Sequence, residues 1–151
     1  MTRDHVRDNQ TGWVAKHIQR YVATDGAQGH DYHGYPTLLL TTRGRKTGDL
    51  RRTALIYGRD GDRYVLVGSN GGASAHPGWY HNIVAEPAVL VQVRADRFAA
   101  VARVAEGAER RRLFDMMVGL FPTYATYAAG TARSIPVVIL TPAGPVPGDA
   151  S

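Results

Sequence analysis

Three short apolar segments separated by turn signals are the feature that most restricts the fold of this chain. Residues 36–42, 51–58 and 63–69 are rich in Leu, Ile, Val and Thr, a composition that favours β-strands. Glycines punctuate the first connection, and the Asp-Gly pair at 60–61 in the second is a strong hairpin signal. The segments therefore predict three consecutive antiparallel strands.

The remaining strands follow no alternating strand–helix order. Residues 88–94 and 97–104 predict a second hairpin that turns around Ala95 and Asp96, and residues 136–141 predict a last strand. We expect a mainly β chain with flanking helices, an α+β fold of about six strands. Its core would be a split, closed or partly closed antiparallel β-barrel, because closure removes exposed strand edges.

Helical periodicity appears in residues 12–24 and 106–120, and a short helix is expected to begin near Pro77. The apolar stripe of the first helix consists of Trp13, Val14, His17, Ile18, Tyr21 and Val22. This stripe either packs on the rest of the domain or lies on a membrane surface as a basic amphipathic helix.

A chain of 151 residues has the length of one domain. We expect residues 1–142 to form that domain, with residues 1–24 as an N-terminal helical segment and residues 25–35 as a polar linker. Residues 143–151, rich in Pro, Gly and Ala, are expected to form a flexible tail.

The chain contains no cysteine, which excludes a disulfide, a thiolate metal site and a Cys nucleophile. His30, Asp31 and His33 lack further ligand spacing, and His76 and His81 would lie on different faces of a helix, so no metal site is predicted. G-x-S-x-G and P-loop motifs are absent from the sequence. Redox chemistry would therefore need a bound organic cofactor.

No apolar run approaches the roughly 20 residues of a membrane span, and the polar start lacks the apolar core of a signal peptide. We expect a cytoplasmic protein, with peripheral membrane contact through the first helix as the alternative. The net charge of +5 and the pI near 9.8 favour an acidic partner: nucleic acid, an anionic membrane or a phosphorylated small molecule.

Positive charge is concentrated in the stretch "TTRGRKTGDLRR", which we call the cationic hairpin (residues 41–52). Such a run is either a solvated loop or an anion-binding surface. At the end of the third predicted strand, a glycine-rich segment contains Ser69 and Asn70. Aromatic residues follow further along the chain: Trp79, Tyr80, Phe121, Tyr124 and Tyr127. Glycines let a flat ring approach the backbone, aromatic rings form a wall, and Arg and Lys neutralise phosphate. The combination predicts a site for an anionic cofactor with a planar ring.

Three segments resemble, in order and spacing, the deazaflavin (coenzyme F420)-dependent nitroreductase and quinone reductase family of actinobacteria. They are "LLLTTRGRKTGDLRRTAL", "VLVGSNGGASAHPGWYHNIVAEPAV" and "FPTYATYAAGTARSIPVVIL", and the resemblance covers about residues 36–142. It implies a split β-barrel oxidoreductase that transfers a hydride from reduced F420 to a quinone or similar electron-poor conjugated acceptor, with nitroreductase side activity. His76 stands where the family usually has Asn before Pro77.

Carried over residue by residue, the resemblance implies that the cofactor's phosphate and acidic tail are held by Arg45, Lys46, Thr47 and Arg51. The other implied cofactor-binding positions are Arg52, Thr53, Ala54, Ile56, Val67, Gly68, Ser69, Asn70, Gly78, Trp79, Tyr80, Asn82 and Tyr124. The implied acceptor pocket consists of Ile56, Phe121, Tyr124 and Tyr127. Ser69 and Tyr124 are candidate proton donors to the reduced acceptor, and solvent is a competing donor.

Phe121 and Ile56 stand where nitro-reducing members of the family have Tyr, so the resemblance favours quinones over nitroimidazoles. Three alternatives remain open: a flavin mononucleotide (FMN) oxidoreductase of the same barrel superfamily, a cofactor binder without turnover, and a nucleic-acid-binding module. A nucleic-acid site would use aromatic residues as stacking platforms, but here they lie away from the cations in sequence. The sequence leaves the oligomeric state open.

Overall fold

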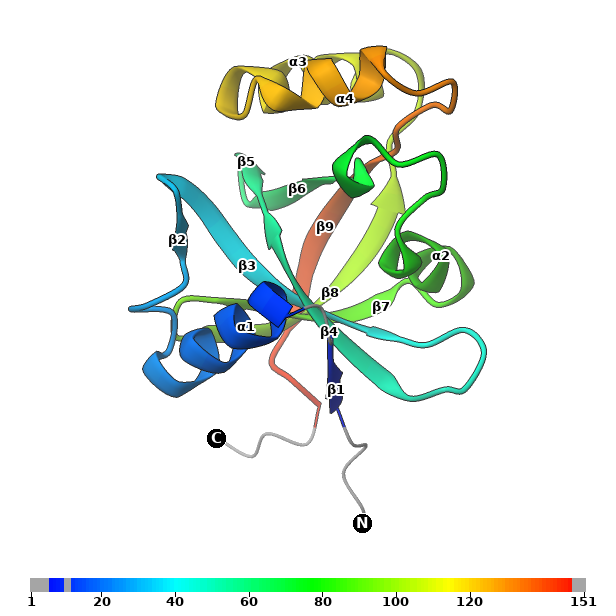
Figure 1. Ribbon diagram of the computed structural model, residues 1–151. Coiled ribbons are helices and arrows are strands. Elements are labelled where there is room, and N and C mark those ends of the chain that lie inside the picture. The colour runs from blue at the N-terminus through cyan, green and yellow to red at the C-terminus, as the bar shows by residue number, and fades with distance from the viewer. Residues whose placement is uncertain (1–5, 10–11, 148–151) are drawn as a thin grey trace.

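The computed structural model describes residues 6–9 and 12–147 as one strongly curved sheet with helices around it (Figure 1). The strands are β1 (Val6–Asp8), β2 (Asp31–Tyr32), β3 (Tyr35–Arg43), β4 (Leu50–Ile56), β5 (Gly58–Asp60), β6 (Arg63–Val67), β7 (Ala88–Val93), β8 (Asp96–Val104) and β9 (Val137–Gly144). The helices are α1 (Gly12–Thr24), the 3₁₀ turn η1 (Asn70–Gly72), α2 (Gly78–Ala85), α3 (Gly107–Leu120) and α4 (Thr123–Ala129).

The main sheet runs in the order β1-β4-β3-β7-β8-β9-β6-β5, and β2 pairs with β3 outside this path. All pairs are antiparallel except β1 with β4, which is parallel. The α+β class is therefore confirmed. The strand count of about six is too low, because the described residues form nine strands, and the sheet path ends at β1 and β5 without closing.

Both short hairpins turn where a residue accepts a positive φ angle. Gly61, with φ of +66°, begins the turn between β5 and β6, as a glycine can without steric cost. The turn between β7 and β8 consists of Arg94 and Ala95, one residue earlier than predicted, and Arg94 has φ of +55°. Arg94 keeps this unfavourable angle because its backbone N–H donates to the Tyr21 hydroxyl at 2.7 Å.

One face of helix α1 is part of the core. Ile18 and Tyr21 are fully buried and pack with Val14 against Leu39 of β3. The interpretation that this face of the helix contacts lipid is therefore wrong for Ile18 and Tyr21, although Trp13 remains 55% exposed. Among the described residues, no helix combines the length and the apolar character that crossing a membrane requires.

The Tyr21 hydroxyl ties α1 to two strands. It donates to the Thr37 carbonyl at 3.0 Å and lies 3.3 Å from the Gln92 carbonyl, while it accepts the Arg94 N–H. Burial raises the pKa of Tyr21 to about 12, which keeps the hydroxyl protonated as a donor. The expected linker, residues 25–35, is ordered beside this contact: it contains β2, and His30 Nε2 is hydrogen-bonded to the Tyr57 hydroxyl at 2.7 Å.

Helices α3 and α4 lie together on one side of the sheet, at the top of Figure 1. Leu113 and Met117 of α3 and Tyr124 of α4 pack against the buried side chains of β6 and β9. The prediction of a helix over residues 106–120 is confirmed. The last strand continues to Gly144 instead of ending at Thr141, because the end of β9 still pairs with β8 beyond an irregularity at Ala99 and Ala100. Residues 148–151 of the expected tail lie outside the described residues.

We predict that Tyr21→Phe lowers the free energy of unfolding by about 1–3 kcal/mol, because the buried Thr37 carbonyl and the part-buried Arg94 N–H lose their partner. The matched control is Tyr80→Phe, whose ring contacts with His76 and His81 survive loss of the hydroxyl; we expect a change below about 0.5 kcal/mol. Urea unfolding followed by circular dichroism measures both. Equal losses would contradict the bridging role of Tyr21.

Candidate active site

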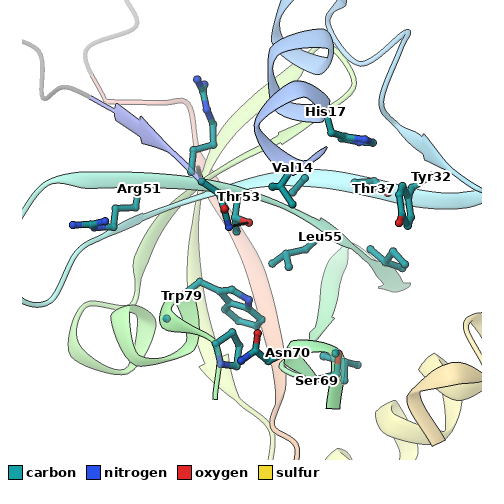
Figure 2. Close-up of a pocket in the computed structure, with 18 of the residues that line it drawn as sticks. Val14, His17, Tyr32, Thr37, Arg51, Thr53, Leu55, Ser69, Asn70 and Trp79 are labelled. Carbon is teal, nitrogen blue, oxygen red and sulfur yellow. Dashed lines mark hydrogen bonds between the residues drawn. The ribbon is translucent and has the colours of Figure 1, made fainter. Parts of the chain in front are cut away.

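A cavity of about 890 Å³ opens between α1, β4, the segment after β6 and α4. Its walls come from segments far apart in sequence: Arg7, Asp8, Asn9, Trp13, Val14, His17, Tyr32, Thr37, Thr42, Arg51, Arg52, Thr53, Ala54, Leu55, Ile56, Val67, Ser69, Asn70, Gly71, Pro77, Gly78, Trp79, Asn82, Phe121, Tyr124 and Tyr127. In Figure 2, Val14 and His17 lie on one side of β4, and Trp79, Asn70 and Ser69 lie on the other. The cavity is large enough for an organic cofactor, since typical ligand sites measure roughly 300–1,000 Å³.

Strand β4 offers an open backbone edge to this cavity. One edge pairs with β3 along the whole strand, whereas β1 covers the other edge only over residues 50–52. The Asn9 N–H donates to the Arg52 carbonyl at 2.9 Å, so the polar backbone groups of Arg52 point towards β1. Because a strand alternates, the N–H and C=O groups of Ala54 and Ile56 point the same way. Within the described chain no strand pairs with them there, so they are available to a flat ligand with polar edges.

Cations line the end of the cavity near the cationic hairpin. Arg52 is committed to Asp8, with donor–acceptor distances of 2.7 and 3.3 Å, and Arg7 pairs with Asp49 at 3.3 Å. Arg51 is exposed and has no ion pair within the described part of the chain. Arg51 is therefore the lining cation best placed to meet a phosphate or carboxylate of a ligand.

The opposite wall begins where β6 ends. Ser69 is buried and Asn70 is exposed, and both line the cavity with Gly71 and Trp79. Asn70, Gly71 and Gly72 have φ angles of +48°, +63° and +80°, so the backbone here turns in the left-handed region. This conformation depends on the glycines, because larger side chains rarely adopt it. The "SNGG" segment is thus a thin wall that lets a ligand approach the backbone.

Phe121, Tyr124 and Tyr127 form an aromatic end of the cavity. Phe121 meets Tyr124 edge-on, with ring centroids 4.9 Å apart. Burial raises the pKa of Tyr124, so its hydroxyl stays protonated at neutral pH. No described residue hydrogen-bonds the hydroxyls of Tyr124 or Ser69, and among the described residues no buried side-chain N or O atom lacks a partner. Both hydroxyls therefore keep solvent contact in the cavity and can bond a ligand.

The structure adds lining residues that the sequence patterns did not indicate. Trp13 stacks on Tyr32, with ring centroids 5.3 Å apart and an interplanar angle of 21°. His17 contacts both rings edge-on, and its Nε2 lies 2.7 Å from the Gly29 carbonyl, which can only accept, so Nε2 carries the proton. The helical spacing of residues 12–24 places His17 on the apolar stripe of α1. No local sequence signal shows whether a residue on this stripe lies in the core or lines a cavity.

Three hairpin residues expected to bind the cofactor do not line the cavity: Arg45, Lys46 and Thr47. Arg45 contributes indirectly, because its backbone N–H and Nη1 donate to Asn82 Oδ1 at 3.2 and 3.3 Å. Lys46 is exposed. The Thr47 side chain accepts a hydrogen bond from the Asp49 N–H at 3.2 Å, which shapes the loop itself.

Gly68 and Tyr80 also lie outside the lining. A Cβ at Gly68 would come within 2.7 Å of the Pro136 ring, so glycine there permits close packing against Pro136, the residue before β9, rather than ligand contact. The Tyr80 ring contacts His76 and His81. The other residues expected from the resemblance, among them Arg51, Ser69 and Trp79, meet in the one cavity.

Comparison with known proteins identifies the family. The model of the F420H2-dependent quinone reductase family matches residues 13–142. The chain belongs to this family. An F420H2-dependent quinone reductase of Mycobacterium tuberculosis is 41% identical over 142 residues, which is 85% of this chain and 95% of that protein. This result confirms the resemblance, the oxidoreductase class and the dependence on F420, and it gives no support to the FMN alternative.

Two solved structures are similar across most of this chain. A structure of an F420-H2-dependent reductase, FDR-A, has a TM-score of 0.65 and 39% identity, covering 70% of this chain and 93% of that one. A domain-swapped dimer has a TM-score of 0.68 and 36% identity, covering 87% of this chain and 99% of that one. The HutZ haem storage protein of Vibrio cholerae, with 16% identity and a TM-score of 0.57, shares the fold alone.

We predict that Arg51→Met weakens F420 binding at least about tenfold at low salt, since a hydrogen bond to a charged group contributes about 1.5–3 kcal/mol. Lys46→Met, in the same hairpin but outside the cavity, should change the dissociation constant less than about twofold. Fluorescence titration measures both, and the effect of Arg51→Met should shrink as salt rises. Equal losses in the two variants would show that the whole loop, and not the lining cation, holds the anion.

Proposed function

We propose that this chain reduces quinones with F420H2 in the cavity between the open edge of β4 and the opposite wall, residues 69–72, which we call the Ser69 wall. The observation that carries the proposal is a set of polar groups that face one space and have no partner among the described residues: the backbone of Ala54 and Ile56 and the hydroxyls of Ser69 and Tyr124. Around them, apolar and aromatic side chains provide flat surfaces. This combination suits a planar ring with polar edges.

The lining residues fit F420, which has a deazaflavin ring, a phosphodiester and an oligoglutamate tail. The backbone of β4 would hold one edge of the ring, residues 69–71 and Trp79 would hold the other, and Arg51 would meet the acidic part. When bound, reduced F420 supplies a hydride to the acceptor. FMN would fill the same ring site, but its single phosphate makes less use of a cationic end.

The protein's own contribution is position, exclusion of water and hydrogen bonding. Trp13, Val14 and Leu55 surround the space with apolar surface on the α1 side. The hydroxyls of Ser69 and Tyr124 would donate to the acceptor oxygen on which negative charge develops. Because its pKa is raised, Tyr124 is a strong candidate for holding a hydrogen bond and a weak one for losing its proton outright. Because an alcohol is a weaker acid than a phenol, Ser69 is no better a source of the proton, and solvent is then the better route.

The acceptor end favours a quinone over a nitro compound. The side chains of Phe121 and Ile56 carry no hydrogen-bond donor, whereas the side chains of Tyr124 and Tyr127 provide hydroxyls. A nitro group concentrates developing negative charge on its oxygens, whereas a quinone spreads that charge over a conjugated ring. A cavity with fewer donors therefore penalises nitro reduction more than quinone reduction. Nitroreductase activity remains a side activity in this proposal.

The direct test is purified protein with F420H2 and menadione, compared with the same reaction using reduced FMN. The proposal predicts rapid F420H2 oxidation that depends on both protein and quinone. It also predicts tighter binding of F420 than of FMN in parallel titrations. Binding of F420 without turnover of any quinone would favour the alternative of a cofactor carrier, and a preference for FMN would refute the assignment.

We predict that Phe121→Tyr raises the rate of bicyclic nitroimidazole reduction at least about tenfold, because one preorganised donor can contribute about 2.7–4 kcal/mol to a transition state. Its matched control is Phe114→Tyr, on the α3 face beside Arg110 and outside the cavity. Steady-state rates with menadione and with the nitroimidazole measure both variants. A wild type that prefers the nitro compound, or an equal gain from Phe114→Tyr, would contradict this account of the acceptor end.

A further inference from the structure

Arg133 makes an unusual set of hydrogen bonds just outside the cavity. Its Nε donates to the Ala73 carbonyl at 2.9 Å, Nη1 to the Gly68 carbonyl at 3.1 Å and Nη2 to the Ser69 carbonyl at 2.6 Å. The side chain is half-buried, and no carboxylate within residues 6–9 and 12–147 pairs with it. One guanidinium therefore joins both ends of the segment that forms the Ser69 wall of the cavity.

This wall, residues 69–72, has little of its own to hold it. Asn70, Gly71 and Gly72 all have positive φ angles, and η1 contributes no buried residue. Its local backbone bonds run from the Gly72 N–H to the Ser69 carbonyl at 2.9 Å and from the Ala73 N–H to the Asn70 carbonyl at 3.1 Å. The exposed Asn70 side chain adds one bond, from Nδ2 to the Ala75 carbonyl at 3.1 Å. A turn with so few contacts opens easily unless something outside it fixes its ends.

The planar fork of arginine suits this task. It presents several N–H groups in fixed directions, whereas lysine offers one compact ammonium on a flexible stem. The fork also meets His76, whose Nδ1 lies 2.9 Å from Arg133 Nη1. Since arginine can only donate, Nδ1 must accept, which requires a neutral ring. Burial, and then the charges of Arg133 and His81, lower the pKa of His76 in agreement with this state.

We propose that Arg133 is a positioning residue that fixes the 69–72 wall, and through it the Ser69 hydroxyl and the ring-binding surface. Arg133 does not line the cavity and acts only through the backbone carbonyls it binds. The consequence for binding rests on the proposed function, whereas the effect on the wall does not. Gly72 faces Tyr127 so closely that a Cβ would come within 3.2 Å of that ring, so movement of the wall also disturbs the acceptor end.

The wall can be tested without any cofactor, by residue-resolved amide hydrogen exchange. In Arg133→Met we expect the Gly72 and Ala73 amides to exchange at least about tenfold faster than in wild type, while the amides of β7 and β8 stay unchanged. Arg103→Met is the matched control, because Arg103 forms two hydrogen bonds of 2.6 and 3.2 Å with Glu109. It should leave both amides unchanged. Unchanged exchange in Arg133→Met would overturn the proposal.

The functional consequence is measured at a temperature well below unfolding. We expect Arg133→Met to weaken F420 binding and to lower kcat with menadione about tenfold each, with Arg103→Met close to wild type. Arg133→Lys should resemble Arg133→Met, since an ammonium cannot bond the three carbonyls together. Full rescue by lysine, or a loosened wall with normal binding and turnover, would overturn the positioning role. If wild type binds no F420, the proposed function fails, and hydrogen exchange alone decides whether Arg133 holds the wall.

Discussion

Backbone N–H and C=O groups need hydrogen-bond partners. In the described part of the chain, half of one edge of strand β4 has no strand paired with it. Strand β3 satisfies one side of β4 completely, while β1 stops after residues 50–52 of the other. Among the described residues, the N–H and C=O groups of Ala54 and Ile56 on this edge therefore have no strand partner and can bond water or a ligand. The surrounding elements are arranged around this gap, with α1 on one side of β4 and Trp79, Asn70 and Ser69 on the other (Figure 2). A longer β1 would close the edge and remove the site.

The residues that line the cavity differ in chemistry from one end to the other, so the two ends have different roles. Charge lies at the end of the cationic hairpin, where Arg52 is neutralised by Asp8 and Arg51 is left to a ligand. Hydroxyl groups and aromatic rings lie at the α4 end, around Tyr124. An anionic cofactor would thus be oriented by its tail before its ring meets the acceptor, and much of the reaction's specificity would come from this orientation.

Local sequence signals predicted the elements well and the directions of side chains less well. Glycine turns and alternating apolar residues indicated the hairpins, and the matched motifs placed Ser69, Trp79 and Tyr124 in one site. The charge run did not reveal that Arg51 lines the cavity and Lys46 does not, because a run of cations does not indicate which of them faces a ligand. His17 and Arg133 had no local signal, since their contacts are set by the tertiary fold. The Arg94 turn depended on Tyr21, distant in sequence.

The central claim is that the open edge of β4 receives the cofactor ring, and amide hydrogen exchange on adding F420 tests it most directly. The account predicts that saturating F420 slows exchange at the Ala54 and Ile56 amides, which face the cavity, while the Lys46 amide in the hairpin loop keeps its rate. Amides that the β3 pairing already protects, such as that of Leu55, should change little. Saturation with F420 without added protection at Ala54 and Ile56 would contradict the account.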